Sequence, residues 1–192
     1  MMGSDLEASR ATLLEELREH ALVIGEVTLT SGRTAQYYVD AKRALLRPAA
    51  FRAVGALLAA EAAERGAGAV GGMTMGADPL ACAAIAAEGG EGLVGFFVRK
   101  ERKEHGLQRW IEGPELAPGS RCLVVEDVVT TGGSTVAAIE RIQEEGLEIA
   151  GVTAVVDRLS GGGEAIAAAA GDAPYGPLVT IDELYPDRPD RG

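Results

Sequence analysis

The chain has 192 residues, of which 47% are hydrophobic, and a formal net charge of -11 at pH 7. This length and apolar content suit one domain with a substantial core. The acidic balance argues against a general binder of nucleic acid or of membrane surfaces. No apolar run approaches the roughly 18 residues of a membrane span, and the acidic N-terminus does not resemble a signal peptide. We therefore expect a cytoplasmic protein without membrane or nucleic-acid partners.

The first part of the chain is expected to lie beside the main sheet. Apolar residues recur at helical spacing through residues 5–22, with charged residues on the opposite face. Residues 25–40 alternate and contain a Ser31-Gly32 pair, which predicts a short hairpin. Pro48 suits a first helical position and opens a predicted helix over residues 48–65.

From residue 67 onward, short apolar runs alternate with helical segments. The predicted strands are residues 67–73, 93–98, 121–126, 149–156 and 178–181, and the predicted helices are residues 79–87, 132–145 and 164–170. This alternation predicts an α/β fold with a mainly parallel, doubly wound sheet. We expect one domain over residues 1–192, in which residues 1–40 and 157–185 form a small cap and residues 186–192 fray. Cys82 and Cys122 are expected to be buried free thiols.

One stretch carries a recognisable chemistry. The strand at residues 121–126 ends in the carboxylates of Glu126 and Asp127, and a loop rich in hydroxyls and glycine leads into the next helix. A helix N-terminus offers unpaired N–H groups to a phosphate, and glycines allow close approach. Carboxylates at the carboxyl end of a strand can accept hydrogen bonds from sugar hydroxyls or hold a hydrated Mg²⁺. The stretch therefore predicts a site for a phosphorylated ribose. The candidate loop residues are Val128, Val129, Thr130, Thr131, Gly132, Gly133 and Ser134.

Two common phosphate motifs are excluded, because no Gly-Lys-Ser/Thr follows the loop and no Gly-x-Gly-x-x-Gly accompanies it. An ordinary strand, turn and helix with a polar N-cap is the remaining alternative. The fixed order of strand, acid pair and loop resembles the signature of the type I phosphoribosyltransferases. The resemblance implies that the loop holds the 5′-phosphate of 5-phosphoribosyl 1-diphosphate and that Glu126 and Asp127 hold the ribose hydroxyls, with Asp127 also catalytic. It implies a Mg²⁺ cofactor held mainly through substrate oxygens and water, so no protein ligand is assigned to the metal.

A second stretch gathers positive charge after the strand at residues 93–98. Its cations are Arg99, Lys100, Arg102, Lys103 and Arg109, and His105 lies among them. Two glycines can pivot the segment, so residues 99–113 are a candidate lid over the diphosphate. The alternative is a solvated loop in which interleaved glutamates balance the cations.

The order Arg99-Lys100-x-x-Lys103-x-His105-Gly106 resembles the catalytic loop of the orotate phosphoribosyltransferases within that family. Residues 25–33, the aromatic segment 37–40 and the turn at residues 71–80, which faces the diphosphate in the family, are similar too. The resemblance implies that Arg99, Lys100, Lys103 and His105 bind the diphosphate and that the last three are catalytic. It also implies orotate contacts from Thr130, Arg158 and Tyr38.

Arg158 follows the strand at residues 149–156, where a guanidinium can grip a carboxylate through two hydrogen bonds. The alternative is a surface ion pair with Asp157 or another acid. Tyr37 and Tyr38 alternate faces on a strand, so at most one can face the base.

Three positions depart from the family pattern. Thr30 and Met75 stand where many members have lysine, and Lys42 and Arg33 are the candidates to replace those cations. The acid pair is Glu-Asp instead of Asp-Asp, which keeps both charges.

The resemblance implies that orotate and 5-phosphoribosyl 1-diphosphate give orotidine 5′-monophosphate and diphosphate, a step of pyrimidine and UMP biosynthesis. It also implies a homodimer in which Arg99 or Lys103 reaches the neighbouring site. Two alternatives stay open. One is a phosphoribosyltransferase for a purine base, and the other is a non-catalytic sensor of phosphoribosyl diphosphate.

Overall fold

A mainly parallel sheet forms the centre of the molecule in the computed structural model, which describes residues 2–28, 34–102 and 109–191. Within these residues the sheet has six strands in the order β5-β4-β3-β6-β7-β8, all parallel to their neighbours except the edge strand β5. A separate antiparallel pair is made by β1 and β2. The predicted α/β class with a mainly parallel sheet is confirmed.

The strands are β1 (Leu22–Thr28), β2 (Thr34–Val39), β3 (Ala69–Met73), β4 (Val94–Val98), β5 (Ile111–Glu112), β6 (Arg121–Val129), β7 (Glu148–Asp157) and β8 (Tyr175–Thr180). The helices are α1 (Met2–His20), α2 (Lys42–Leu45), α3 (Pro48–Glu64), α4 (Asp78–Ala86), α5 (Gly133–Glu144), α6 (Gly162–Ala170) and α7 (Ile181–Leu184).

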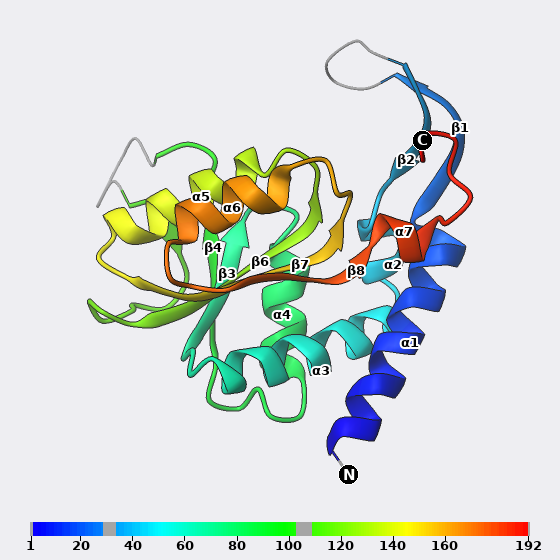
Figure 1. Ribbon diagram of the computed structural model, residues 1–192. Coiled ribbons are helices and arrows are strands. Elements are labelled where there is room, and N and C mark those ends of the chain that lie inside the picture. The colour runs from blue at the N-terminus through cyan, green and yellow to red at the C-terminus, as the bar shows by residue number, and fades with distance from the viewer. Residues whose placement is uncertain (1, 29–33, 103–108, 192) are drawn as a thin grey trace.

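Helices cover both faces of the sheet (Figure 1). The pair α5 and α6 lies on one face, and α3 and α4 lie on the other. Successive side chains of β6 enter opposite cores, because Leu123 and Val125 pack with the α3 side while Cys122 and Val124 pack with the α5 side. Burial on both faces explains why β6 reads as a continuous apolar run. It also places the acid pair and the loop after β6 in the middle of the carboxyl edge.

The hairpin β1–β2 stands beside this sheet, with α1, α2 and α7 near its base (Figure 1). The predicted hairpin is therefore present, and its connecting residues 29–33 lie outside the described residues. The cap prediction was wrong for most of residues 157–185, because β8 joins the main sheet and α6 covers it. Their apolar side chains explain the difference, since Ile166 and Val179 are fully buried in the cores of the main layer.

Several boundaries also differ from the predictions. β6 continues past residue 126 to Val129, because its pairing with β7 extends that far. The elements α2, β5 and α7 were not predicted, since two to four residues are too few to show a period. Cys122 is buried as expected, but Cys82 is exposed, because α4 turns the neighbouring Ala81 and Ala83 toward the core instead. No helix in the described part of the chain is long and apolar enough to cross a membrane.

Candidate active site

The loop between β6 and α5 is where the sequence predicts a phosphate site. It surrounds a cavity of about 150 Å³ lined by Glu126, Val128, Val129, Thr130, Thr131, Gly132, Gly133, Ser134 and Thr135. Gly132 has a φ of 77°, and a Cβ there would lie 2.6 Å from the carbonyl oxygen of Gly162. Only glycine fits this position, and the contact fixes the loop against α6. The first turn of α5 presents its N–H groups beside this cavity, which suits a phosphate.

Glu126 is the buried member of the acid pair. Its carboxylate accepts hydrogen bonds from Thr135 Oγ1 at 2.9 Å and from the main-chain N–H of Asp127 at 3.2 Å. Burial, and then the negative charge of Asp127, raises the pKa of Glu126 to about 8 despite these bonds. Glu126 therefore holds its proton to a higher pH than an exposed glutamate does.

Asp127 is held from two sides. Its Oδ1 accepts from the main-chain N–H of Val128 at 2.9 Å, and its Oδ2 accepts from Lys42 Nζ at 2.8 Å. Lys42 Nζ also lies 3.6 Å from a carboxylate oxygen of Asp40. Burial alone would lower the pKa of Lys42. The hydrogen bond and the charge of Asp127, with smaller contributions from Asp40 and Tyr38, raise this pKa above its ordinary value.

Lys42 is therefore a cation of this site. The sequence could name it only as one of two candidates, because its place depends on α2, which was not predicted. The other candidate, Arg33, lies outside the described residues, as does Thr30.

The turn at residues 71–80 lies against the acid pair. A Cβ on Gly76 would come within 2.5 Å of Asp127 Oδ1 and 2.9 Å of Glu126 Oε1, so the main chain itself packs on both carboxylates. The turn contains a cis peptide between Thr74 and Met75, and Thr74 Oγ1 donates to Asp78 at 2.6 Å. Met75, which stands in the place of the expected lysine, is 71% exposed. The family's cation is thus absent from this turn, although the turn is in the predicted place.

The described part of the cationic segment borders the same turn. A cavity of about 370 Å³ is lined by Thr74, Phe97, Arg99, Lys100, Glu101 and Glu112. Lys100 is exposed beside this cavity, while Arg99 donates to Glu112 at 3.0 Å. Lys103 and His105 lie outside the described residues, so the structure brings together only the first part of the predicted lid and the diphosphate-facing turn.

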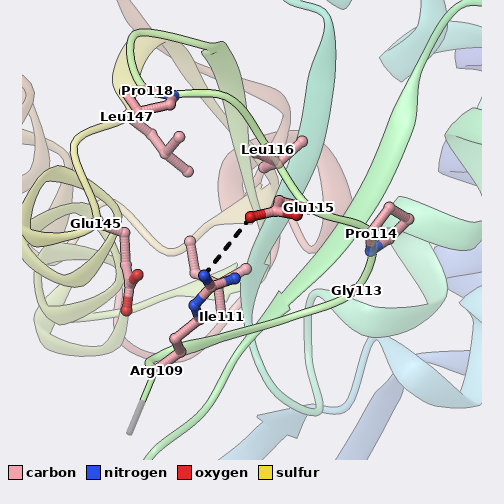
Figure 2. Close-up of a pocket in the computed structure, with 9 residues that line it drawn as sticks. All are labelled: Arg109, Ile111, Gly113, Pro114, Glu115, Leu116, Pro118, Glu145 and Leu147. Carbon is pink, nitrogen blue, oxygen red and sulfur yellow. Dashed lines mark ion pairs between the residues drawn. The ribbon is translucent and has the colours of Figure 1, made fainter. Parts of the chain in front are cut away.

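A further cavity, of about 190 Å³, lies where the segment returns to the sheet (Figure 2). Arg109 and Glu115 pair across its mouth at 3.7 Å, and Ile111, Leu116 and Leu147 add apolar walls. None of the residues predicted for phosphoribosyl diphosphate or orotate lines this cavity.

Arg158 lies at the same sheet edge as the phosphate loop. Its main-chain N–H donates to the carbonyl of Val129 at 2.9 Å, and its guanidinium carbon lies 5.2 Å from the centroid of the Tyr37 ring. Its Nε is buried and has no hydrogen-bond partner among the described residues. Asp157 does not pair with it, because the Asp157 carboxylate accepts from Tyr175 Oη and from the N–H of Leu159, each at 2.7 Å. A buried donor without a partner is costly, which favours a ligand as its partner.

The two tyrosines of β2 do lie on opposite faces. Tyr37 is 4% exposed and packs edge-to-face on Tyr185, and its hydroxyl donates to Asp190 at 3.0 Å. Tyr38 is 39% exposed and lies on the Lys42 side.

The tail after α7 is bound to the rest of the chain, contrary to the expected fraying, because Arg188 and Tyr37 both bind Asp190.

No cluster of three or more potential metal ligands is present among the described residues. The acid pair supplies hard oxygens, but two carboxylates do not make a dedicated cage for a divalent cation.

Comparison with protein families agrees with this geometry. The model of the phosphoribosyl transferase domain matches residues 46–169, from the start of α3 to the end of α6. The fold and the site thus define a phosphoribosyltransferase.

Close relatives narrow the family. The orotate phosphoribosyltransferase of Corynebacterium glutamicum is 48% identical over 176 residues, which cover 92% of this chain and 94% of the relative. A crystal structure of the Mycobacterium tuberculosis orotate phosphoribosyltransferase with Fe(III) dicitrate has a TM-score of 0.82 at 44% identity, covering 92% of this chain and 99% of that one. Another structure of the tuberculosis enzyme, in complex with 5-phospho-α-D-ribosyl 1-diphosphate, has a TM-score of 0.77 at 40% identity, with 92% and 98% covered. The chain belongs to the orotate phosphoribosyltransferase family.

Proposed function

We propose that this chain transfers the phosphoribosyl group of 5-phosphoribosyl 1-diphosphate to orotate, giving orotidine 5′-monophosphate and diphosphate on the route to UMP. The observation that carries the proposal is a single hydrogen bond, from the N–H of Arg158 to the carbonyl of Val129. This main-chain bond places Arg158, whose half-buried side chain has a buried Nε without a hydrogen-bond partner among the described residues, beside the loop proposed for phosphate and ribose. A base with a carboxylate and a sugar with a phosphate would then meet at one edge of the sheet.

The chemistry follows from the charges on the ribose side. The bond from C1 of ribose to the diphosphate oxygen breaks, a bond from C1 to N1 of orotate forms, and the proton of N1 leaves to the diphosphate or to water. The residues 130–134 hold the 5′-phosphate, while Glu126 and Asp127 accept from the ribose hydroxyls. The negative charge of Asp127 stabilises positive charge that develops on the ribose ring. Thr130, Tyr38 and Arg158 orient the base.

Leaving-group stabilisation falls to the cationic segment. Lys100 borders the cavity beside the diphosphate-facing turn, and Lys103, His105 and Arg99 are assigned to the diphosphate from the sequence. Closure of residues 99–113 would exclude water from the activated sugar. Lys103→Ala should accordingly lower kcat more than it weakens binding of orotidine monophosphate, which has no diphosphate.

Mg²⁺ is proposed as the cofactor, bound mainly by substrate oxygens and water. The residues present fit that mode, since Asp127 and Glu126 offer oxygens at the ribose but no third ligand of a cage is near among the described residues. When bound, Mg²⁺ would neutralise charge on the diphosphate.

A homodimer is also proposed, with Lys103 or Arg99 shared across the interface. Arg99 is bound to Glu112 in this chain, which favours Lys103 as the shared residue. The cytoplasmic location stays a prediction.

The deciding experiment is base-dependent release of diphosphate in the presence of Mg²⁺. Orotate, xanthine, hypoxanthine and adenine are compared at equal concentration, with a reaction that lacks the protein as the blank. Turnover with orotate alone supports the proposal. Preference for a purine would favour the alternative enzyme, and ligand binding without any turnover would favour a sensor.

A further inference from the structure

The guanidinium of Arg141, a residue not predicted for the site, contacts three residues in the segments around it. Arg141 lies near the end of α5 and is half-buried. Its Nη1 donates to the carbonyl of Arg99 at 2.8 Å and lies 3.3 Å from Met73 Sδ. Its guanidinium carbon is 4.3 Å from the centroid of the Trp110 ring. Met73 ends β3 where the diphosphate-facing turn begins, while Arg99 and Trp110 flank the cationic segment.

The two flanks are also joined to each other and to α5. The N–H of Arg99 donates to the carbonyl of Trp110 at 2.9 Å, which closes the base of the segment. Trp110 donates from its main-chain N–H to Glu145 at 2.8 Å and from its indole Nε1 to Glu144 at 2.7 Å. Both flanks of the cationic segment are therefore attached to the C-terminal end of the helix whose N-terminus faces the phosphate cavity.

Helix geometry makes this attachment informative. Gly133 and Arg141 are eight residues apart, so they are separated by about 12 Å along a rigid helix axis. Side chains on a helix project toward its N-terminus, and Arg141 accordingly reaches back to the carboxyl ends of β3 and β4. The rigid helix α5 thus fixes the distance between a phosphate bound at its start and the cationic segment attached near its end.

We propose that Arg141 is a positioning residue that sets the cationic segment and the diphosphate-facing turn relative to the phosphate loop. This inference rests on the proposed function, in which the 5′-phosphate and the diphosphate belong to one substrate. The interactions are directional. A guanidinium can stack flat on Trp110 while it donates to a carbonyl, whereas an ammonium cannot do both in the same geometry.

The first test compares Arg141→Met and Arg141→Lys with the wild type. Methionine keeps apolar packing and lysine keeps the charge, but neither retains the planar donor. We expect kcat to fall about 10- to 100-fold in both variants, because a small misplacement of the reacting groups is costly. The Kd for orotidine monophosphate, which lacks a diphosphate, should change less than about threefold.

Arg65→Met is the matched control for stability. Arg65 is a half-buried arginine that binds Glu61 and the carbonyl of Pro174, away from the site. It should lower the melting temperature and leave kcat unchanged at a temperature well below melting. If Arg141→Met behaves like this control, with kcat within about twofold of wild type, Arg141 is structural only and the proposal is overturned.

A second variant keeps the inference falsifiable should Arg141→Met fold poorly. Trp110→Ala removes the other half of the stack, and the effects of the two substitutions on kcat should combine less than multiplicatively, since the stack is shared while each residue keeps a further contact of its own. Multiplying effects would contradict the proposal. Failure of the proposed function is distinguishable, because the wild type would then release no diphosphate with orotate.

Discussion

The two halves of the site are built differently. On the phosphate side, the acid pair is buried, and its carboxylates accept hydrogen bonds from Thr135, from Lys42 and from the main chain. On the base side, Arg158 has a buried Nε without a partner among the described residues, and its guanidinium lies over the ring of Tyr37. The carboxylates of the acid pair are thus held by neighbouring groups of the chain, whereas one buried donor of Arg158 is not.

This difference has a physical reason. Binding a phosphorylated sugar is common to phosphoribosyltransferases, and it uses a strand, a loop and a helix that the fold needs anyway. In the proposed site, base selection would depend on Arg158 and Tyr38, and Arg158 lies over Tyr37 of the hairpin, which is bound to the tail. A site of this kind can change its base by replacing rim residues while the phosphate half stays fixed.

The largest effect is expected on the base side. Arg158→Ala should raise the KM for orotate and lower kcat/KM by about 30- to several-thousand-fold, since losing a charged partner of a buried carboxylate costs about 2–5 kcal/mol. The Kd of phosphoribosyl diphosphate should stay nearly unchanged. Steady-state kinetics and calorimetry measure the two quantities. Arg158→Lys should recover only part of the loss. An orotate KM that stays close to that of wild type in both variants would leave the base without an identified reader.

On the phosphate side, substitution of Asp127 should change kcat. Asp127→Asn keeps the shape and an acceptor for Val128 but removes the charge next to Lys42 and the ribose. We expect kcat to fall about 10²–10³-fold, as for other groups that stabilise developing charge. Circular dichroism should show an intact fold, and the exposed Asp172→Asn serves as the control. Near-normal turnover would remove Asp127 from the reaction.

The sequence predicted the phosphate half far better than the base half. Strand β6, the acid pair and the loop are contiguous, so their spatial relation follows from local structure alone. The glycine contact between residues 132 and 162 could not be predicted, because it joins elements distant in the chain. The prediction failed where short elements decide placement, as with α2, which brings Lys42 to Asp127.

On the base side, the sequence could identify Arg158 but not its supports. The contact with Tyr37 depends on how the hairpin leans toward β7, and the bond to Asp190 depends on a tail with no periodic pattern. Arg141 was missed for the same reason. Its three contacts come from β3 and the two flanks of the cationic segment, and a lone arginine in an amphipathic helix gives no signal of them.

The pH dependence of the free energy of unfolding should show the cost of burying Glu126 in the phosphate half. The pKa of Glu126 is raised to about 8 in the folded protein, above that of an exposed glutamate, mainly by burial. Between these two values the folded state binds more protons than the unfolded state, so this group makes stability fall as pH rises from about 4.5 to 8. Between pH 6 and pH 8, the free energy of unfolding should fall by about 1–2 kcal/mol more in the wild type than in Glu126→Gln. Urea unfolding of the free protein at the two pH values measures this difference. Parallel curves for the two proteins would show that Glu126 titrates normally.

The smallest effect tests whether the tail supports the base reader. Tyr37→Phe keeps the ring beneath Arg158 and the edge contact with Tyr185 but removes the hydrogen bond to Asp190. One such bond contributes about 0.5–1.5 kcal/mol, so the KM for orotate should rise about two- to tenfold while the Kd of phosphoribosyl diphosphate stays constant. Asp190→Ala should give a similar rise, since it removes the same bond from the other side. Tyr185→Phe is the matched control, because it keeps the ring contact and no hydrogen bond of its hydroxyl is described. If Tyr37→Phe and Asp190→Ala have the same KM for orotate as Tyr185→Phe, the ring of Tyr37 alone supports Arg158. The hydrogen bond between Tyr37 and the tail would then contribute nothing to the base site.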